Sequence, residues 1–228
     1  MALSNKEIPT DLREYIEINI LPQYATFDKA HRLNHAEKVI EESMKLAQYY
    51  EVEPAMVYTI AAYHDLGLCE GREFHHLISG KILAADEKLR KWFSEAQLQT
   101  MKEAVEDHRA SNKQAPRSMY GKIVAEADRI INPEVSLRRA IQYGLSNYPE
   151  LDEEAQYERA VAHLRSKYAY GGYLKLWIPQ SSNAYQLEKL RAILTDESKL
   201  RSIFERLYKE EILSLIHISE PTRLDVIS

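Results

Sequence analysis

The chain has 228 residues, of which 45% are hydrophobic and 29% are charged, and its formal net charge is −5. This length suits one globular domain or at most two small ones. The scarcity of glycine (7 residues) and proline (8 residues) favours an all-α fold over a loop-rich β architecture. The acidic balance argues against nucleic acid as a partner, because nucleic-acid binding normally needs a basic stripe on the surface.

The sequence carries no sign of secretion or membrane insertion. A single cysteine, Cys69, cannot form an internal disulfide, which fits a reducing compartment. Residues 1–22 carry charges throughout, unlike a signal peptide. No apolar run reaches the roughly 18 residues that span a bilayer. We therefore expect a cytoplasmic protein with no membrane partner.

Apolar residues recur at helical spacing along most of the chain. The first predicted helix covers residues 11–20, and the second begins at Asn34 as its N-cap, with Glu37 three residues later. Pro54 is expected in the first turn of the third helix, which is apolar nearly all round and should be central, and Ser94 should cap the fifth. From the third helix onward, the predicted ranges are 55–66, 75–93, 95–111, 118–131, 134–148, 152–170, 184–194 and 196–212.

The helical pattern divides the chain into three regions. We predict one helical domain at residues 1–150, a helical extension packed on it at residues 151–212, and a foreign tail at residues 213–228. The tail contains LSLIHISEPTR, which resembles the translation of a sequencing adapter, so the native C-terminus is expected to be missing. A natural disordered tail is the alternative.

Histidine and aspartate gather in the first half of the chain. His64 and Asp65 stand side by side in the apolar run AAYHDLGL, where a carboxylate is costly unless it is paired or bound to a metal. Imidazole and carboxylate ligands without thiolate suit Fe, Mn, Zn or Mg at a hydrolytic centre rather than a structural zinc site. A hydrogen-bonded pair at a helix end is the alternative role for the doublet. The other histidines and the aspartate that lie near these positions in the sequence are His31, His35, His75, His76, His108 and Asp128.

The ordered set His35 … His64-Asp65 … Asp128 resembles the H…HD…D signature of the HD-domain superfamily of metal-dependent phosphohydrolases. The flanking segments HRLNHAEKV, AAYHDLGL and GKIVAEADRI agree with this signature, and the resemblance covers roughly residues 27–132. It implies that the first domain is an HD-type helical bundle.

The resemblance also implies how the ligands are shared. The four signature residues would bind a first divalent ion (Mn, Fe, Co, Mg or Zn), and a water activated there would attack phosphorus. His76 in HHLISG and His108 in EDHRAS match the extra histidines of subfamilies that hold two metals, so these two residues and a bridging Asp65 would form a second site. His75 is expected to face solvent, although His75 and His76 could exchange roles.

Other residues near these motifs are candidates for the remaining chemistry. Asp65 would be catalytic as well as a ligand, and Glu73, just past the doublet, is a candidate general acid toward the leaving group. Arginine side chains can clamp phosphate through a planar fork. For Glu73 and for each substrate candidate, a solvated surface residue is the alternative. The candidate substrate contacts are His31, Lys81, Arg109 and Arg117.

We therefore expect an enzyme that cleaves a phosphoester or phosphoanhydride in a nucleotide or similar small metabolite, with a homodimer possible. Two alternatives stay open. One is a di-iron oxygenase of the same fold, which would depend on O₂ and a reductant. The other is a catalytically inactive module that binds a nucleotide and turns over no phosphorylated compound.

Overall fold

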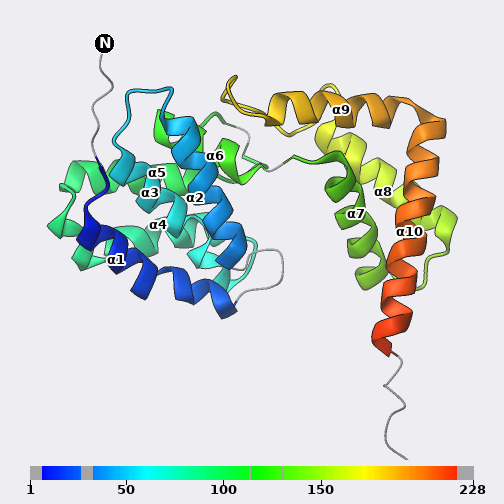
Figure 1. The fold of residues 1–228 in the computed structure, drawn as a ribbon, viewed down its shortest axis with the longest axis horizontal. Coiled ribbons are helices and arrows are strands. Elements are labelled where there is room, and N and C mark those ends of the chain that lie inside the picture. The colour runs from blue at the N-terminus through cyan, green and yellow to red at the C-terminus, as the bar shows by residue number, and fades with distance from the viewer. Residues whose placement is uncertain (1–6, 27–32, 113, 130, 220–228) are drawn as a thin grey trace, which may run out of the picture. The chain divides into compact units, whose positions relative to one another are not determined.

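The structure, a computed structural model, describes residues 7–26, 33–112, 114–129 and 131–219, with side chains up to residue 215. In these ranges it contains α-helices and short 3₁₀ helices but no strand, so the predicted all-α fold is confirmed (Figure 1). None of the helices in these ranges is both long and apolar enough to cross a membrane.

Helices account for most of the described residues. The α-helices are α1 (Thr10–Asn19), α2 (Leu33–Ala47), α3 (Pro54–Tyr63), α4 (His75–Ala85), α5 (Glu95–Asp107), α6 (Met119–Asp128), α7 (Pro133–Asn147), α8 (Glu153–Tyr168), α9 (Asn183–Thr195) and α10 (Glu197–Ser219). The 3₁₀ helices are η1 (Leu21–Thr26), η2 (Leu66–Glu70) and η3 (Glu87–Lys91).

The chain divides into two compact units. The first comprises residues 1–130 and 175–182, and the second comprises residues 131–174 and 183–228. The division thus falls before α7 rather than near residue 150, where the sequence analysis placed it. Asn132 caps this helix by accepting a hydrogen bond from Val135 N (3.1 Å), and a proline follows at the first helical position, so a new helix begins here.

The first unit is built around α3. Every residue from Ala55 to Tyr63 is buried, and α2, α4, α5 and α6 all contact this helix, as the group of blue to green helices in Figure 1 shows. This arrangement confirms the central position predicted from the apolar surface of the helix. Because α3 ends at Tyr63, the chain carries His64 and Asp65 directly out of the most buried helix into the middle of the unit.

The segment 175–182 joins the first unit through a buried carboxylate. Glu126 on α6 is fully buried and accepts hydrogen bonds from Trp177 N (2.7 Å) and from Ser181 Oγ. These contacts satisfy a carboxylate that burial alone would make costly. The segment therefore packs on the helix that also carries Asp128.

Gly67 allows η2 to pack closely against α4. A Cβ atom at this position would lie 2.2 Å from His75 O and 2.7 Å from Ser79 N. Gly67 N instead donates a hydrogen bond to Ser79 Oγ (2.8 Å). A side chain here would push α4 away from the segment that follows the His64-Asp65 doublet.

The helix ends agree with some predicted caps and differ from others. Ser94 caps α5 through a capping box and Pro54 opens α3, as predicted. The prediction of Asn34 as an N-cap is wrong, because α2 already includes the residue before it. The last helix continues to Ser219, past its predicted end at residue 212, and so includes part of the predicted tail. The adapter origin of the tail stays a prediction.

The second unit is a smaller helical assembly. Its helix α7 contacts α8, α9 and α10, and α9 also contacts α8 and α10. Leu137 and Ile141 on α7 and Leu164 on α8 are buried there. Burial of these apolar side chains stabilises the unit. The described residues of this unit contain no cluster of histidines and carboxylates that could hold a metal.

Candidate metal centre

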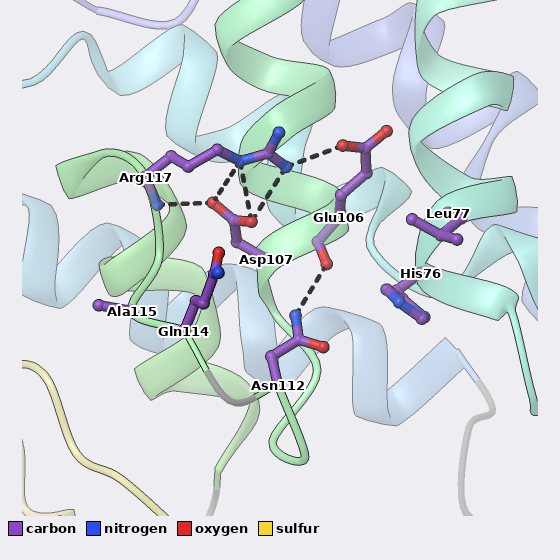
Figure 2. A pocket seen from close by; sticks show the side chains of 8 residues that line it. All are labelled: His76, Leu77, Glu106, Asp107, Asn112, Gln114, Ala115 and Arg117. Carbon is purple, nitrogen blue, oxygen red and sulfur yellow. Dashed lines mark hydrogen bonds and ion pairs between the residues drawn. The ribbon is translucent and has the colours of Figure 1, made fainter.

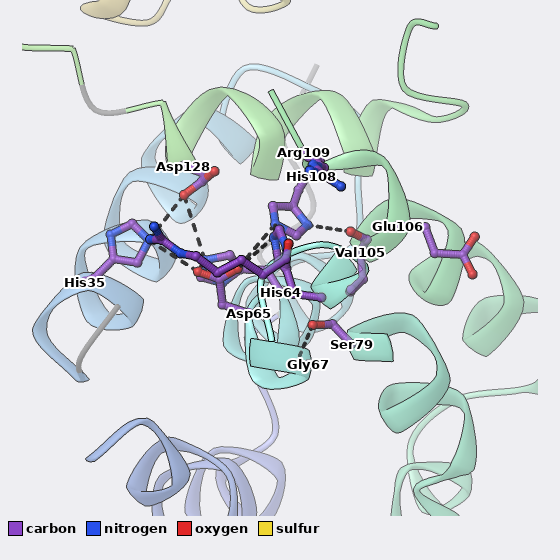
Figure 3. A network of polar contacts seen from close by, with 12 residues as sticks. His35, His64, Asp65, Gly67, Ser79, Val105, Glu106, His108, Arg109 and Asp128 are labelled. Atoms are coloured by element: carbon purple, nitrogen blue, oxygen red, sulfur yellow. Dashed lines mark hydrogen bonds and ion pairs between the residues drawn. The ribbon is translucent and has the colours of Figure 1, made fainter. Parts of the chain in front are cut away.

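The ends of helices α2 to α6 bring imidazole and carboxylate groups together, and Figure 3 shows His35, His64, Asp65, His108 and Asp128 among them. His64 and Asp65 directly follow α3, and His108 is the C-cap residue of α5. Helix ends suit such a cluster because their side chains can converge from different directions. The other contributors are His35 in the first turn of α2, His75 at the start of α4 and Asp128 at the end of α6.

Asp65 lies at the centre of this cluster and faces histidines on both sides. Its Oδ2 atom is 3.4 Å from His64 Nε2 and 3.8 Å from His35 Nε2. Its Oδ1 atom is 3.4 Å from both His75 Nε2 and His108 Nε2. Each carboxylate oxygen of Asp65 therefore has its own pair of imidazoles, which is the arrangement of a carboxylate that bridges two cation sites.

Asp128 adds a second carboxylate beside His35 and His64, the pair on the Oδ2 side of Asp65. Its Oδ1 atom lies 3.2 Å from His35 Nε2 and 3.9 Å from His64 Nε2. The predicted helix 118–131 continued past Asp128, but this residue is the last of α6, where its side chain can reach α2 and the end of α3. The first group thus offers two imidazoles and two carboxylates.

Two sets of three ligand atoms are close enough to share an ion. In each set the atoms lie within 4.8 Å of one another. The sets overlap at Asp65. They are His35, His64 and Asp65, and Asp65, His75 and His108.

The histidines are oriented by the backbone. The Nδ1 atoms of His64, His75 and His108 lie 2.7, 2.8 and 2.6 Å from the carbonyl oxygen three residues earlier in the chain. A carbonyl only accepts hydrogen bonds, so each Nδ1 carries the proton, and in the neutral ring Nε2 keeps its lone pair. Such an outer hydrogen bond fixes the tautomer and ring direction of metal-binding histidines.

A cation fits beside the Nε2 atoms of these histidines. The Nε2 atoms of His75 and His108 are 3.3 Å apart, and with both Nδ1 atoms protonated no proton lies between the two neutral rings. His64 Nε2 is buried and makes no hydrogen bond to the described residues, although Asp65 lies beside it. A divalent metal bound here would accept electron pairs from the Nε2 atoms, and the nitrogen and oxygen donors fit Mn, Fe, Co, Zn or Mg.

One protein-family model matches the part of the chain that contains this cluster. The HD-domain family model matches residues 32–132, a range that contains all six residues of the cluster. We refer to residues 32–132 as the HD domain, after the family model that they match. The resemblance seen in the sequence is thereby confirmed.

Two solved structures are similar to the chain. A predicted HD superfamily hydrolase from an uncultured Thermotogales bacterium is 23% identical, with a TM-score of 0.49, over 70% of this chain and 89% of that one. YpgQ from Bacillus subtilis, solved in complex with ADP, is 14% identical, with a TM-score of 0.49, over 93% of this chain and 96% of that one. The search of curated proteins found no match.

The histidines and carboxylates of the HD-domain cluster shift one another's pKa values. Burial opposes a charge on His64, but the negative charges of Asp65 and Asp128 outweigh it and raise the pKa of His64 to about 9, so without metal Nε2 carries a proton that a bound cation would replace. Burial would raise the pKa of Asp65, yet His64 and His108 hold that pKa well below its usual range. The pKa of Asp128 is lowered as well, against the effect of burial, by His35 and His64. Both carboxylates are therefore anionic at neutral pH and attract a cation.

Tyr24 supports the doublet from outside the cluster. Its hydroxyl donates to Ala62 O (3.0 Å) and accepts a hydrogen bond from Asp65 N (3.3 Å). Tyr24 is fully buried, so these bonds fix the backbone of Asp65. No local pattern pointed to Tyr24, because the contact links residues 41 positions apart.

The structure differs from the sequence analysis at the histidine pair. His76 was expected to complete the second group, but His75 lies against Asp65. Adjacent side chains diverge on a helix, so only one of the two can face the cluster. The His76 ring is buried beside it, with the two ring centroids 5.5 Å apart. The alternative that the two histidines exchange roles therefore fits the structure, with His75 in the cluster instead of facing solvent.

The other predicted residues surround the cluster or lie apart from it. Glu73 is exposed in the loop before α4, and its carbonyl oxygen accepts a hydrogen bond from Arg109 Nη1. Lys81 is exposed on α4. Arg117 is bound to carboxylates instead, at 2.8 Å from Glu106 and 3.0 Å from Asp107, which leaves it poorly placed to clamp phosphate. His31 lies outside the described residues.

Proposed function

We propose that the HD domain is a metal-dependent hydrolase that cleaves a phosphoester or phosphoanhydride in a nucleotide or similar small metabolite. The observation that carries this proposal is the position of Asp65, with a pair of imidazoles on each carboxylate oxygen. A pair of cations bound on the two sides of one carboxylate is suited to phosphoryl chemistry, because charge develops on both the attacking and the leaving oxygen.

The donor atoms define which residues would hold metal. One ion would lie between His35, His64, Asp128 and the Oδ2 atom of Asp65, and a second would lie between His75, His108 and the Oδ1 atom of Asp65. When bound, divalent metal lowers the pKa of a coordinated water and neutralises charge on phosphoryl oxygens.

Protein side chains at the rim would complete the chemistry. We assign Glu73 as the proton donor to the leaving group, since its exposed carboxyl follows the doublet and precedes His75 by two residues. Arg109, next in the chain to His108, would hold a phosphoryl oxygen through its guanidinium. Its hydrogen bond to the carbonyl of Glu73 fastens the loop before α4 to the end of α5, so the proton donor and the phosphate-binding cation are held together.

A second candidate function follows from the same geometry. A bridging carboxylate with imidazoles on both sides is also a donor set that suits a pair of iron ions and O₂ chemistry. In that case turnover would require O₂ and a reductant. A hydrolase requires neither of them, so assays with and without oxygen separate the two functions.

The test combines metal analysis with an activity screen. Purified protein would be loaded separately with Mn, Fe, Co, Zn and Mg, its metal content measured, and its activity screened against nucleotides and other phosphorylated metabolites. We expect phosphate release with at least one metal, and its loss in His64→Ala together with bound metal. His163→Ala, which removes an exposed histidine of α8, serves as the matched control. Full metal content and activity in His64→Ala would show that the site assignment is wrong.

A further inference from the structure

Residues 175–182, which we call the strap, surround a buried carboxylate of α6 within the first unit. The backbone N–H of Trp177 donates to Glu126 Oε2 (2.7 Å), and the N–H of Ile178 donates to the same oxygen (3.4 Å). The hydroxyl of Ser181 donates to the other oxygen, Oε1. Hydrogen bonds to a charged acceptor are stronger than those between neutral groups, so the strap holds this carboxylate firmly.

Contacts away from Glu126 fix the position of the strap itself. Ile178 is buried in the hydrophobic core of the first unit, and Trp177 packs against that core. The hydroxyl of Tyr50 donates to Gln180 Oε1 (2.6 Å). Because these contacts do not involve α6, the strap has its own attachment to the first unit and can hold α6 in place.

Glu126 lies two residues before Asp128, the last residue of α6. At about 100° per residue, side chains two positions apart leave a helix on nearly opposite sides. The strap therefore holds one side of the last turn while Asp128 faces His35 and His64 on the other. Helix ends fray readily, so the position of Asp128 depends on what holds this turn.

The end of α5, which precedes His108, has a comparable contact. Glu106, two residues before this histidine, lies 2.8 Å from Arg117 Nη2, as Figure 2 shows. In both helices, a different segment thus holds a carboxylate two residues before a proposed ligand. The Arg117 side chain is 46% exposed, whereas Glu126 is fully buried. Loss of a partner costs more at a buried carboxylate, so the contact with the strap should matter more.

We propose that the strap positions Asp128 as a metal ligand by holding Glu126, so that Glu126 and Ser181 are positioning residues. The proposal rests on the proposed function for the ion beside Asp128, here called the first ion. The second ion, on the Oδ1 side of Asp65, has its histidines at α4 and at the end of α5. A loosened strap should therefore weaken the first ion alone, whereas a general loss of stability would weaken both.

The binding test measures each ion by itself. In a His108→Ala background only the first ion should bind, and in a His35→Ala background only the second. Mn²⁺ would be titrated into the full chain by calorimetry in each background, with and without Ser181→Ala. We expect this change to weaken the first ion by about tenfold, the lower end of what losing a supporting hydrogen bond costs at metal sites, and to leave the second unchanged.

Two further variants control for the loss of a hydroxyl. Ser181→Thr keeps the hydroxyl and should retain the wild-type affinity for the first ion. Ser198→Ala, at an exposed serine of α10 bonded to Asp196, is the matched control and should change neither ion. Equal weakening of both ions in Ser181→Ala, or of neither, would overturn the positioning role.

A measurement without metal separates this proposal from the proposed function. Asp128 Oδ1 lies 3.2 Å from His35 Nε2, so the NMR signals of the His35 ring report the position of Asp128. Ser181→Ala should shift these signals and leave those of His108 unchanged. Such a shift in a protein that binds no divalent metal would overturn the metal-dependent hydrolase and keep the strap. Unchanged His35 signals, with both ions bound as in the wild type, would overturn the strap and keep the metal centre.

Discussion

The HD domain and the second unit both gather charged side chains, but in opposite ways. In the second unit, Arg138 lies 2.6 Å from Glu211 and 2.5 Å from Glu210, and Arg206 lies 3.3 Å from Glu134. These groups are partly or largely exposed, and each cation has a carboxylate partner. Pairs of this kind contribute little to stability and need no further ligand.

The cluster around Asp65 is buried and incomplete. Asp65 and His64 are almost fully buried, the Nε2 atoms of the imidazoles face one another or carboxylates, and no Lys or Arg lies within ion-pair distance of either carboxylate among the described residues. Burial of such groups is costly without a partner. The contrast indicates that the charged groups of the second unit pair with one another, whereas those of the HD domain form a cluster that can hold a cation.

Replacing Asp65 should have the largest effect. Asp65→Asn removes the anion shared by both histidine groups, so we expect the loss of both metals and a decrease of about 1000-fold or more in kcat/KM. Metal analysis and a thermal melt with added Mn²⁺ would check this, since metal should raise the Tm of the wild type but not of the variant. Asp11→Asn, at an exposed carboxylate paired with Lys91, is the control. A metal-dependent rise in Tm in Asp65→Asn would contradict the bridging role.

The histidine groups can be removed one at a time. His108→Ala should release one metal and leave the other, because only the Oδ1 side of Asp65 is affected. His75→Ala should do the same, whereas His76→Ala should retain both metals. Metal content per chain, measured for the three variants, distinguishes the two neighbours. If His76→Ala lost a metal and His75→Ala did not, the ligand would be His76, as the sequence analysis expected.

His75 and His76 show which features of the site the sequence alone does not predict. The all-α fold follows from sparse glycine and proline with helical periodicity, and the order of His35, His64-Asp65 and Asp128 points to one cluster. The choice between His75 and His76 depends on where α4 begins, and helix ends are uncertain by one or two residues in any sequence.

Contacts between residues far apart in the chain are a second feature that the sequence alone does not predict. Tyr24 contacts Asp65 from 41 positions away, and the carboxylates that occupy Arg117 lie on α5, ten and eleven residues earlier. Sequence spacing beyond one or two helical turns carries no information about such contacts. Arg117 could therefore be recognised as a potential phosphate clamp from its type, but not as a side chain already held by carboxylates.

Tyr24→Phe should have a moderate effect on the stability of the HD domain and on its metal affinity. The change leaves the buried Ala62 carbonyl and Asp65 N–H without their hydroxyl partner, at a cost of about 1–3 kcal/mol in the free energy of unfolding. It should also lower metal affinity by about 10-fold to 100-fold, as loss of outer hydrogen bonds does at metal sites. Chemical denaturation and metal titration would measure both. Tyr49→Phe, at an exposed ring, controls for the loss of a hydroxyl; equal metal affinities in the two variants would refute the orienting role.

Arg138→Ala should have the smallest effect. Of its partners on α10, Glu210 is exposed and the partly buried Glu211 keeps a hydrogen bond from Gln142, so the free energy of unfolding should change by no more than about 1 kcal/mol. Added salt should reduce even this difference, because exposed pairs are screened. Metal content and kcat/KM should stay at the wild-type values, since every proposed ligand belongs to the HD domain. Denaturation at low and high salt, with metal analysis of the same samples, would test this. A loss of metal in Arg138→Ala would show that the second unit contributes to the metal centre, and the contrast between the two units would fail.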